Sequence, residues 1–389
     1  MDAVAGGSLA LLRQPVVHYG ARLADALPRI VAERGCARVL PVVTGSLRRH
    51  PVVEQAIAAL GNTALPVFGD LKPHTPFTVV LDLAAEIDRA QPDLIVAVGG
   101  GSALDAAKVG ALAANAGAAD HDALLALRSV PGAQGEMRPS PVGRVVPIVA
   151  VPTTLSAAEF GMIGGATDTT TGIKHIYKSD NLAPDVVVFD PWLTAATPAG
   201  LWLSTGVRSL DHGIETVLSR DANPFTDALA LRGLTLLGEG LRQSHTRPDD
   251  VEARHRCQLG VWLAACGIGR VRYGASHGLG HQLGALAGVP HGLTSCVLLP
   301  AVLAYTEPVS AGRQAWIAEA LGGPGRPAAE VVRGLIAALG LPTRLSDLGV
   351  AAETLPRVAE SALGNAFVKA NLRPVTTVDD AMAILRAAF

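Results

Sequence analysis

A short apolar run at 94–98 leads directly into three glycines and a serine at 99–102, and then into the alanine-rich stretch 103–114. The run shows no polar alternation, which is typical of a strand buried on both faces of a parallel sheet. Strand, glycine loop and helix in this order place backbone N–H groups and a helix N-terminus together at a sheet edge. We therefore predict a phosphate-binding loop at Gly99, Gly100, Gly101 and Ser102, with a tight packing turn as the alternative.

Two halves of the chain differ in their hydrophobic patterning. Apolar runs at 38–43, 64–68, 94–98, 145–151 and 186–190 alternate with helical patterns, which predicts βαβ units. From about residue 194, helical spacing takes over, with helices expected at 201–218, 225–243, 251–266, 277–286, 312–321, 328–339 and 378–388. We predict an α/β domain with a parallel sheet over 1–195, an all-α domain over 196–389, and a cleft shared between them.

Composition excludes several classes of protein. Apolar residues make up 49% of the chain and charged residues 17%, which argues against disorder. The formal net charge of -2 is spread evenly, so nucleic acid is not expected as a partner. Four scattered cysteines without a CxxC pair argue against a disulfide framework or a thiolate metal site. We find no secretory signal at the N-terminus and no uninterrupted membrane span, so we expect a cytoplasmic protein without membrane contact.

Several polar residues lie close to the glycine loop in this scheme. Asp105 falls in the first helical turn, where it could cap the backbone or bond a ribose hydroxyl. Thr153 and Thr154 follow the run 145–151, at the carboxyl edge where open α/β sheets bind ligands, although a hydroxyl-capped turn is the alternative. Lys174 could equally be a solvated surface lysine. Because no Lys-Ser/Thr follows the glycines, ATP chemistry is disfavoured.

Histidines gather in one passage of the second half. His277 and His281 are four residues apart and share a helix face, and the turn before His291 lets that residue fold back toward them. Imidazoles are common ligands of zinc and iron and common acids or bases near neutral pH, so the spacing fits either role. A fourth histidine, His212, lies one helical turn after Arg208, and Asp211 is expected to point about 100° away from His212.

Four motifs, in this order and at these separations, carry a resemblance to a known family. They are GGGSALDAAK at 99–108, VPTTLSAAEF at 151–160, LDHGIE at 210–215 and HGLGHQLG…GVPHG at 277–292. The chain resembles the iron-containing alcohol dehydrogenase superfamily, and within it the maleylacetate reductase branch, of which HTP at 74–76 is also reminiscent. The resemblance implies a Rossmann-like nicotinamide-binding domain, a dehydroquinate synthase-like fold, NAD(P)H as cofactor and a homodimer.

The resemblance also implies a role for each matched position. It assigns a pyrophosphate loop to Gly99, Gly100, Gly101 and Ser102, cofactor contacts to Thr153, Thr154 and Lys174, metal ligands to His212, His277 and His291, and proton relay to His281. After the run 38–43 come Thr44, Gly45 and Ser46, with no acid to select the ribose diol of NAD. We therefore count Thr44 among the cofactor-binding residues and expect tolerance of NADPH.

One departure from the family pattern decides our functional prediction. Metal-dependent members carry an aspartate four residues before the helix histidine, and this chain has Arg208 there. A guanidinium cannot ligate a cation, and we do not expect Asp211 to replace the lost ligand. We predict an NAD(P)H-dependent reductase, without metal, acting on a carbonyl or conjugated C=C of a small carboxylated oxo-acid. The catalytic residues would be Arg208, His212, His277, His281 and His291.

Two other readings of the same motifs stay open. One is an alcohol dehydrogenase that binds iron or zinc through His212, His277 and His291. The other is a non-redox lyase or cyclase of the dehydroquinate synthase type, which shares the architecture and uses the cofactor transiently. Chelator sensitivity would favour the first, and net NAD(P)H consumption would exclude the second.

Overall fold

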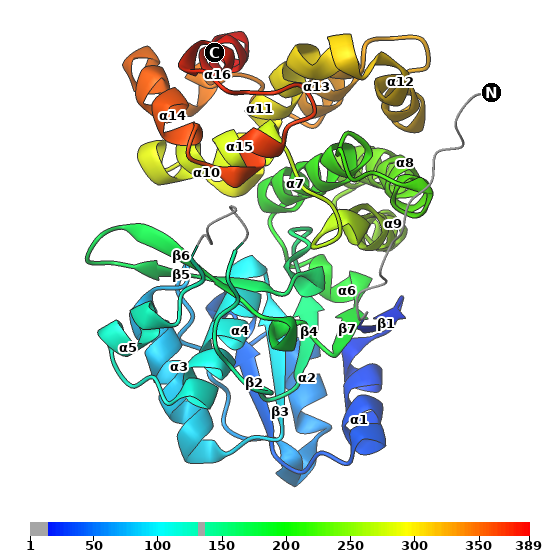
Figure 1. Cartoon of the computed structure of the whole chain (residues 1–389). Helices are drawn as coiled ribbons and strands as arrows, with labels where there is room; N and C mark the ends of the chain where they lie inside the picture. The colour runs from blue at the N-terminus through cyan, green and yellow to red at the C-terminus, as the bar shows by residue number, and fades with distance from the viewer. Residues whose placement is uncertain (1–14, 131–136) are drawn as a thin grey trace, which may run out of the picture.

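The computed structural model describes residues 15–130 and 137–389 of the chain. Its N-terminal half is built on a parallel sheet with the strand order β1-β7-β4-β3-β2 (Figure 1). The strands are β1 (Val16–Tyr19), β2 (Val39–Val43), β3 (Leu94–Gly99), β4 (Ile148–Pro152) and β7 (Val186–Phe189). All residues of β2, β3, β4 and β7 are buried, which explains why their sequences lack polar alternation.

Helices cover both faces of this sheet. They are α1 (Leu23–Arg34), α2 (Pro51–Ala58), α3 (Phe77–Ala90), α4 (Gly101–Ala116) and α5 (His121–Ala126). Alternate residues of each strand belong to two separate apolar clusters: Val39 and Val43 pack with α1 and α2, whereas Leu40 and Val42 pack with α3 and α4. The sheet is therefore the middle layer of three, and its predicted parallel α/β character is confirmed.

One expectation for this half was wrong, and its hairpin was not predicted. The run 64–68 is not a strand: it touches β2 only through isolated bridges from Ala64 to Val39 and from Phe68 to Val42. Pro66 lies between these bridges and has no N–H, so a continuous hydrogen-bond ladder cannot form. The second difference is an antiparallel hairpin, β5 (Ile163–Asp168) and β6 (Ile173–Lys178), which the sequence patterns did not reveal.

The C-terminal half is helical. It follows the short α6 (Pro191–Thr194) and contains α7 (Ala199–Val217), α8 (Pro224–Thr246), α9 (Val251–Ala264), α10 (Ala275–Ala287), α11 (His291–Thr306), α12 (Ala311–Ala320), α13 (Ala328–Ala338), α14 (Leu355–Ala362), α15 (Ala366–Ala370) and α16 (Val378–Ala388). Short 3₁₀ turns join the elements: η1 (Gly45–Leu47), η2 (Gly61–Thr63), η3 (Ala158–Phe160), η4 (Asp180–Leu182), η5 (Ala265–Gly267), η6 (Glu307–Val309), η7 (Ser346–Leu348) and η8 (Ala352–Thr354).

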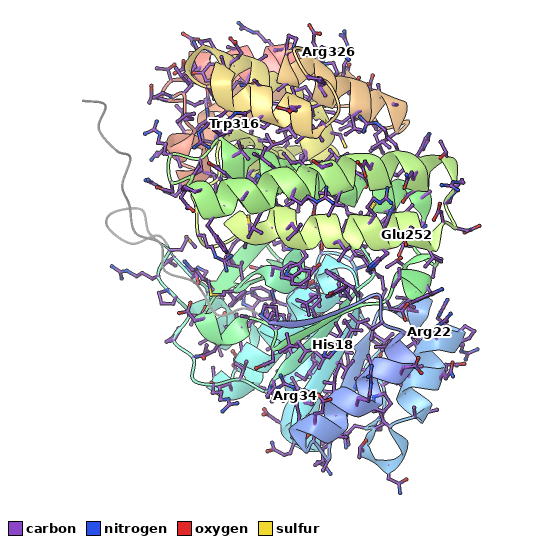
Figure 2. The ribbon with its side chains drawn as sticks, turned by 90° about the vertical axis from the view of Figure 1, so that its right-hand side faces the viewer. His18, Arg22, Arg34, Glu252, Trp316 and Arg326 are labelled. Atoms are coloured by element: carbon purple, nitrogen blue, oxygen red, sulfur yellow. The ribbon has the colours of Figure 1, made fainter. Side chains whose placement is uncertain are left out.

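Helices α8 and α9, green and yellow-green in Figure 2, lie side by side above the α/β half. Helix α11 was not predicted, because it is apolar on nearly every face and so lacks helical periodicity. The segment His291–Val309 is long and apolar enough to span a bilayer by length and composition alone. It packs against α7, α10, α13 and α16, with 61% of its apolar 18-residue window buried, so it is a central helix of this half.

Candidate active site at the junction of the two halves

The glycine loop lies where β3 meets α4. Gly99 has a backbone φ of +152°, and a Cβ added to it would lie 2.0 Å from Oγ1 of Thr44. A Cβ on Gly100 would lie 2.9 Å from Cγ2 of Thr154. Gly100 also precedes α4 without a side-chain cap. The N–H groups of Ala103 and Leu104 donate to its carbonyl, whereas those of Gly101 and Ser102, at the very start of the helix, have no intrahelical acceptor. This cradle fits a pyrophosphate, because the backbone can approach it closely and the helix end favours negative charge.

The ends of three neighbouring strands surround this loop. Thr44 follows β2, and its N–H donates to the carbonyl of Val98 at 3.0 Å. The N–H of Thr153, at the end of β4, donates to the carbonyl of Gly99 at 2.9 Å. Thr153 and Thr154 are both buried. The structure thus brings Thr44, Gly99 and the two threonines together at the carboxyl edge of the sheet.

Lys174 and Asp105 form an ion pair beside the loop. Their Nζ and Oδ2 atoms are 2.8 Å apart. Lys174 reaches Asp105 by crossing Gly165, where an added Cβ would lie 2.2 Å from the lysine Cε. The β5–β6 hairpin therefore holds this lysine against the first turns of α4. Asp105 pairs with Lys174 rather than capping the helix, which corrects one of the two roles expected for it.

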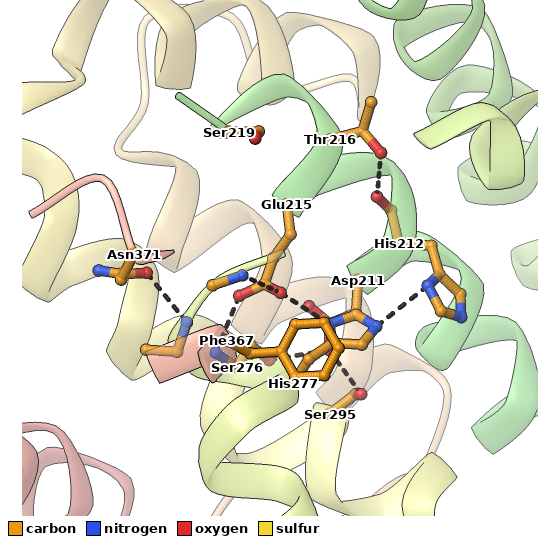
Figure 3. Close-up of polar contacts among 12 residues, drawn as sticks. Asp211, His212, Glu215, Thr216, Ser219, Ser276, His277, Ser295, Phe367 and Asn371 are labelled. Atoms are coloured by element: carbon orange, nitrogen blue, oxygen red, sulfur yellow. Dashed lines mark hydrogen bonds and ion pairs between the residues drawn. The ribbon is translucent and has the colours of Figure 1, made fainter. Parts of the chain in front are cut away.

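Helices α7 and α10 bring His212 and His277 together, as Figure 3 shows. The Nε2 atom of His277 lies 3.0 Å from Nδ1 of His212, and its Nδ1 lies 2.7 Å from Oε2 of Glu215. Glu215 also accepts hydrogen bonds from the N–H groups of Gly274 and Ser276, at 2.9 and 2.8 Å. It therefore caps the N-terminus of α10 from a neighbouring helix and fixes the His277 ring at the same time.

The other two histidines form a second pair. The rings of His281 and His291 are 5.9 Å apart, and Phe367 of α15 lies 5.3 Å from the ring of His281. His291 follows the turn, as expected, and is the first residue of α11. Burial, with the Arg208 charge as the second cause, lowers the pKa of His281 to about 3 and that of His291 to about 4. Both imidazoles are therefore neutral at physiological pH.

Asp211 belongs to this site, although it was not among the site residues that we predicted. It lies three residues after Arg208 and so shares a helix face with it. Its Oδ2 lies 3.5 Å from Nη1 of Arg208 and accepts hydrogen bonds from the hydroxyls of Ser276 and Ser295, at 2.8 and 2.7 Å. The positive charge of Arg208 therefore has a buried carboxylate beside it.

Asp211 and Glu215 form a potential cation site with His277. Within residues 15–130 and 137–389, Asp211, Glu215 and His277 are the only group whose ligating atoms all lie within 4.8 Å of one another. The histidines His212, His277 and His291 do not form such a group there. His277 is already hydrogen-bonded to Glu215, and Asp211 and Glu215 accept from hydroxyl and backbone donors. The ligating atoms are thus hydrogen-bonded to one another and to hydroxyl and backbone donors, so a bound cation would have to displace these hydrogen bonds.

Burial shapes the charges of the acids. It raises the pKa of both Asp211 and Glu215 to about 7, and the nearby Arg208 opposes the rise in each case. One oxygen of Asp211, Oδ1, has no hydrogen-bond partner among the described residues.

Sequence reasoning missed several residues of the site. Glu215 stands in the LDHGIE motif one turn after His212, so helical spacing could have revealed it. Ser276 and Ser295 carried no such signal, because their partner Asp211 lies far away in sequence. Lys108 ends the motif GGGSALDAAK and is fully buried. Its Nζ donates to the carbonyls of Ala158, Gly161 and Ile163, which anchors the segment after the threonines.

Comparison with known proteins agrees with this geometry. Residues 15–191 match the family model "Iron-containing alcohol dehydrogenase", and residues 202–389 match "Fe-containing alcohol dehydrogenase family, C-terminal". Dehydrogenase ALT3 of Alternaria alternata is 35% identical, over 91% of this chain and 99% of the relative. The maleylacetate reductase of a Rhizobium species is 31% identical, over 81% and 80%.

A solved structure shares the whole architecture. The crystal structure of a 1,3-propanediol oxidoreductase superposes with a TM-score of 0.88 and 30% identity, covering 98% of this chain and 100% of that one. The predicted combination of a parallel α/β domain with a helical domain is therefore confirmed. The chain belongs to the iron-containing alcohol dehydrogenase family, near its maleylacetate reductase branch, and is an NAD(P)-dependent oxidoreductase.

Proposed function

We propose that this enzyme uses NAD(P)H to reduce a carbonyl or conjugated C=C of a small oxo-acid, without a metal ion. The observation that carries the proposal is the position of Arg208. Its side chain is 12% exposed and lies at the metal-ligand position of the family, with a hydroxyl and a carboxylate behind it. A guanidinium binds a carboxylate through two parallel N–H donors, so a substrate with an acid group suits it better than a simple aldehyde.

The residues at the junction would divide the work as follows. Thr44, the glycine loop at 99–102, Thr153, Thr154 and the Asp105–Lys174 pair would bind the cofactor. A bound reduced nicotinamide supplies a hydride. Arg208 would hold the substrate and stabilise the negative charge that develops on its oxygen. His277 or His281 would relay the proton: a neutral imidazole takes up a proton from water or a neighbouring group at one ring nitrogen as it releases one from the other. His212 and His291 would complete the polar wall around the substrate.

The comparisons leave a second candidate in place. A similar protein of Klebsiella pneumoniae is described as a 1,3-propanediol dehydrogenase, and the family is named for iron. The cluster of Asp211, Glu215 and His277 would be the only candidate for a cation among the described residues. The ligating atoms of His212, His277 and His291 do not all lie close enough together to form such a group there. We further propose the division into domains at 1–195 and 196–389, a homodimer and a cytoplasmic location.

One screen tests the function directly. Oxidation of NADH and of NADPH would be followed with oxo-acids, enol-acids and aldehydes, each with and without chelator. We expect turnover of an oxo-acid or enol-acid that chelator does not change. Loss of activity with chelator, and its recovery with Fe²⁺ or Zn²⁺, would establish the alcohol dehydrogenase alternative. Substrate loss without net cofactor consumption would establish a lyase or cyclase.

Variants at Arg208 test the observation itself. Arg208→Lys keeps the charge but cannot make two parallel hydrogen bonds, so we expect KM for the oxo-acid to rise about tenfold or more. Arg208→Asp should abolish metal-free reduction. If Arg208→Asp reduces the oxo-acid as the wild type does, without added metal, the proposed role of Arg208 is wrong.

A further inference from the structure

Asp211 and Arg208 are linked through a shared hydroxyl. The Nη1 of Arg208 donates to Oγ of Ser295 at 3.1 Å, and that hydroxyl donates to Oδ2 of Asp211 at 2.7 Å. The same carboxylate oxygen lies 3.5 Å from Nη1 directly. Asp211 is 0% exposed, whereas the arginine side chain is 12% exposed. The carboxylate therefore lies on the buried side of the guanidinium, and one nitrogen of the guanidinium is fixed.

The remaining donors of Arg208 are not engaged. Among residues 15–130 and 137–389, the guanidinium makes its hydrogen bond and its ion pair through Nη1 alone. Its Nε and second amino group therefore remain available on the partly exposed side. These are the donors that a planar carboxylate would need for two parallel hydrogen bonds.

Asp211 differs from Glu215 in the partners it holds. Glu215 bonds two backbone N–H groups at the start of α10 and the ring of His277. The hydrogen bonds of Asp211 come only from the hydroxyls of Ser276 and Ser295. Among the described residues no backbone group donates to Asp211. Besides the two hydroxyls, its Oδ2 lies 3.5 Å from Nη1 of Arg208 and 3.6 Å from Nδ1 of His277, and Arg208 is the permanently charged group of these two.

From this arrangement we infer that Asp211, acting through Ser295, is the positioning residue that orients Arg208 to receive the carboxylate of the substrate. The inference rests on the proposed function. Long side chains lose rotamer freedom when they bind, and a guanidinium already fixed at one nitrogen loses less of it. The carboxylate also offsets the cost of holding a buried cation among neutral imidazoles.

Three single variants test the inference. Asp211→Asn removes the charge with little change of shape, and Ser295→Ala removes the linking hydroxyl while keeping the carboxylate. Ser244→Ala is the matched control, since Ser244 is a buried helical serine whose hydroxyl has, among the described residues, a single hydrogen-bond partner, the Cys257 sulfur at 3.8 Å. Binding of oxalate, a non-reducible dicarboxylate, would be measured by calorimetry on the cofactor-loaded full chain, together with KM, kcat and the melting temperature.

We expect Asp211→Asn and Ser295→Ala to weaken oxalate binding about tenfold, and to raise KM for the oxo-acid more than they lower kcat. Arg208→Ala should weaken oxalate binding at least as much. Ser244→Ala should leave both the oxalate affinity and the KM for the oxo-acid unchanged. A purely structural role would instead lower the melting temperature and the active fraction, with KM unchanged. If Asp211→Asn does not fold, Ser295→Ala decides the matter alone.

The inference and the proposed function fail in different ways. If Arg208→Ala weakens oxalate binding but Asp211→Asn and Ser295→Ala bind it as the wild type does, Asp211 does not position Arg208, and the proposed function stands. If Arg208→Ala itself binds oxalate normally, the role of Arg208 in the proposed function is wrong. If elemental analysis finds a bound metal in the wild type that is lost in Asp211→Asn, then Asp211 is a metal ligand and the inference is wrong.

Discussion

Nε2 of His277 lies 3.0 Å from Nδ1 of His212, and Nδ1 of the same ring lies 2.7 Å from the carboxylate of Glu215. One imidazole is thus held at both nitrogens by two residues of a single helix, α7. The ring cannot turn without breaking one of these contacts, so α7 determines the orientation of the His277 ring in the site.

Glu215→Gln should lower both stability and activity. The glutamine NH₂ would face the N–H of Gly274 or of Ser276, which now donate to the carboxylate, so donors would oppose each other in a buried place. We expect the free energy of unfolding to fall by about 2–3 kcal/mol. Urea unfolding followed by circular dichroism measures this. Glu252→Gln, at an exposed position on α9, is the control, and an equal loss in both variants would contradict the assignment.

Gly99→Ala should weaken cofactor binding. Its Cβ would lie 2.0 Å from Oγ1 of Thr44 and 2.8 Å from the Cβ of Ala103, in a backbone conformation that alanine rarely adopts. We expect the free energy of unfolding to fall by at least about 2 kcal/mol and the dissociation constant for NADH to rise at least about tenfold. Fluorescence titration measures the dissociation constant. Gly334→Ala, with open space in α13, should keep full affinity and gain up to about 1 kcal/mol in stability.

Glu159 should make stability depend on pH. Burial raises its pKa from 4.5 to about 7, and neither of its carboxylate oxygens has a hydrogen-bond partner within the described residues. Between these values the folded protein keeps a proton that the unfolded chain has released. The free energy of unfolding therefore falls as pH rises through this window. Glu159→Gln should remove up to roughly 3 kcal/mol of that fall.

Urea unfolding at about pH 5 and about pH 7.5 measures the effect of Glu159, with the exposed Glu353→Gln as control. A wild type and a Glu159→Gln variant that show the same difference between the two pH values would contradict the prediction.

Lys108→Met should loosen the segment that follows the cofactor threonines. The Nζ of Lys108 is fully buried and bonds the carbonyls of Ala158, Gly161 and Ile163. Its loss leaves buried acceptors without a donor, so we expect stability to fall by about 3 kcal/mol and NADH affinity to fall with it. The exposed Lys369→Met should change neither, and an unchanged NADH affinity in Lys108→Met would show that this anchor does not support the cofactor site.

Much of the architecture followed from the sequence alone. Buried strands of a parallel sheet have continuous apolar runs, and surface helices have periodic ones, so β2, β3, β4, β7 and most of the helical half were predictable. Helix α11 was missed because a helix buried all round has no periodicity, and the β5–β6 hairpin because its residues are mixed in character.

Part of the site also followed from the sequence, and part only from the tertiary structure. Local spacing predicted the glycine loop, the placement of His277 and His281 on one helix, and the presence of Arg208 where the family carries a ligand. Only the tertiary structure decided that Asp211 lies behind Arg208, because the hydroxyls that hold this acid come from Ser276 and Ser295 on two other helices. Local sequence fixes which face of a helix a residue occupies, whereas the packing of helices distant in sequence fixes what that face meets.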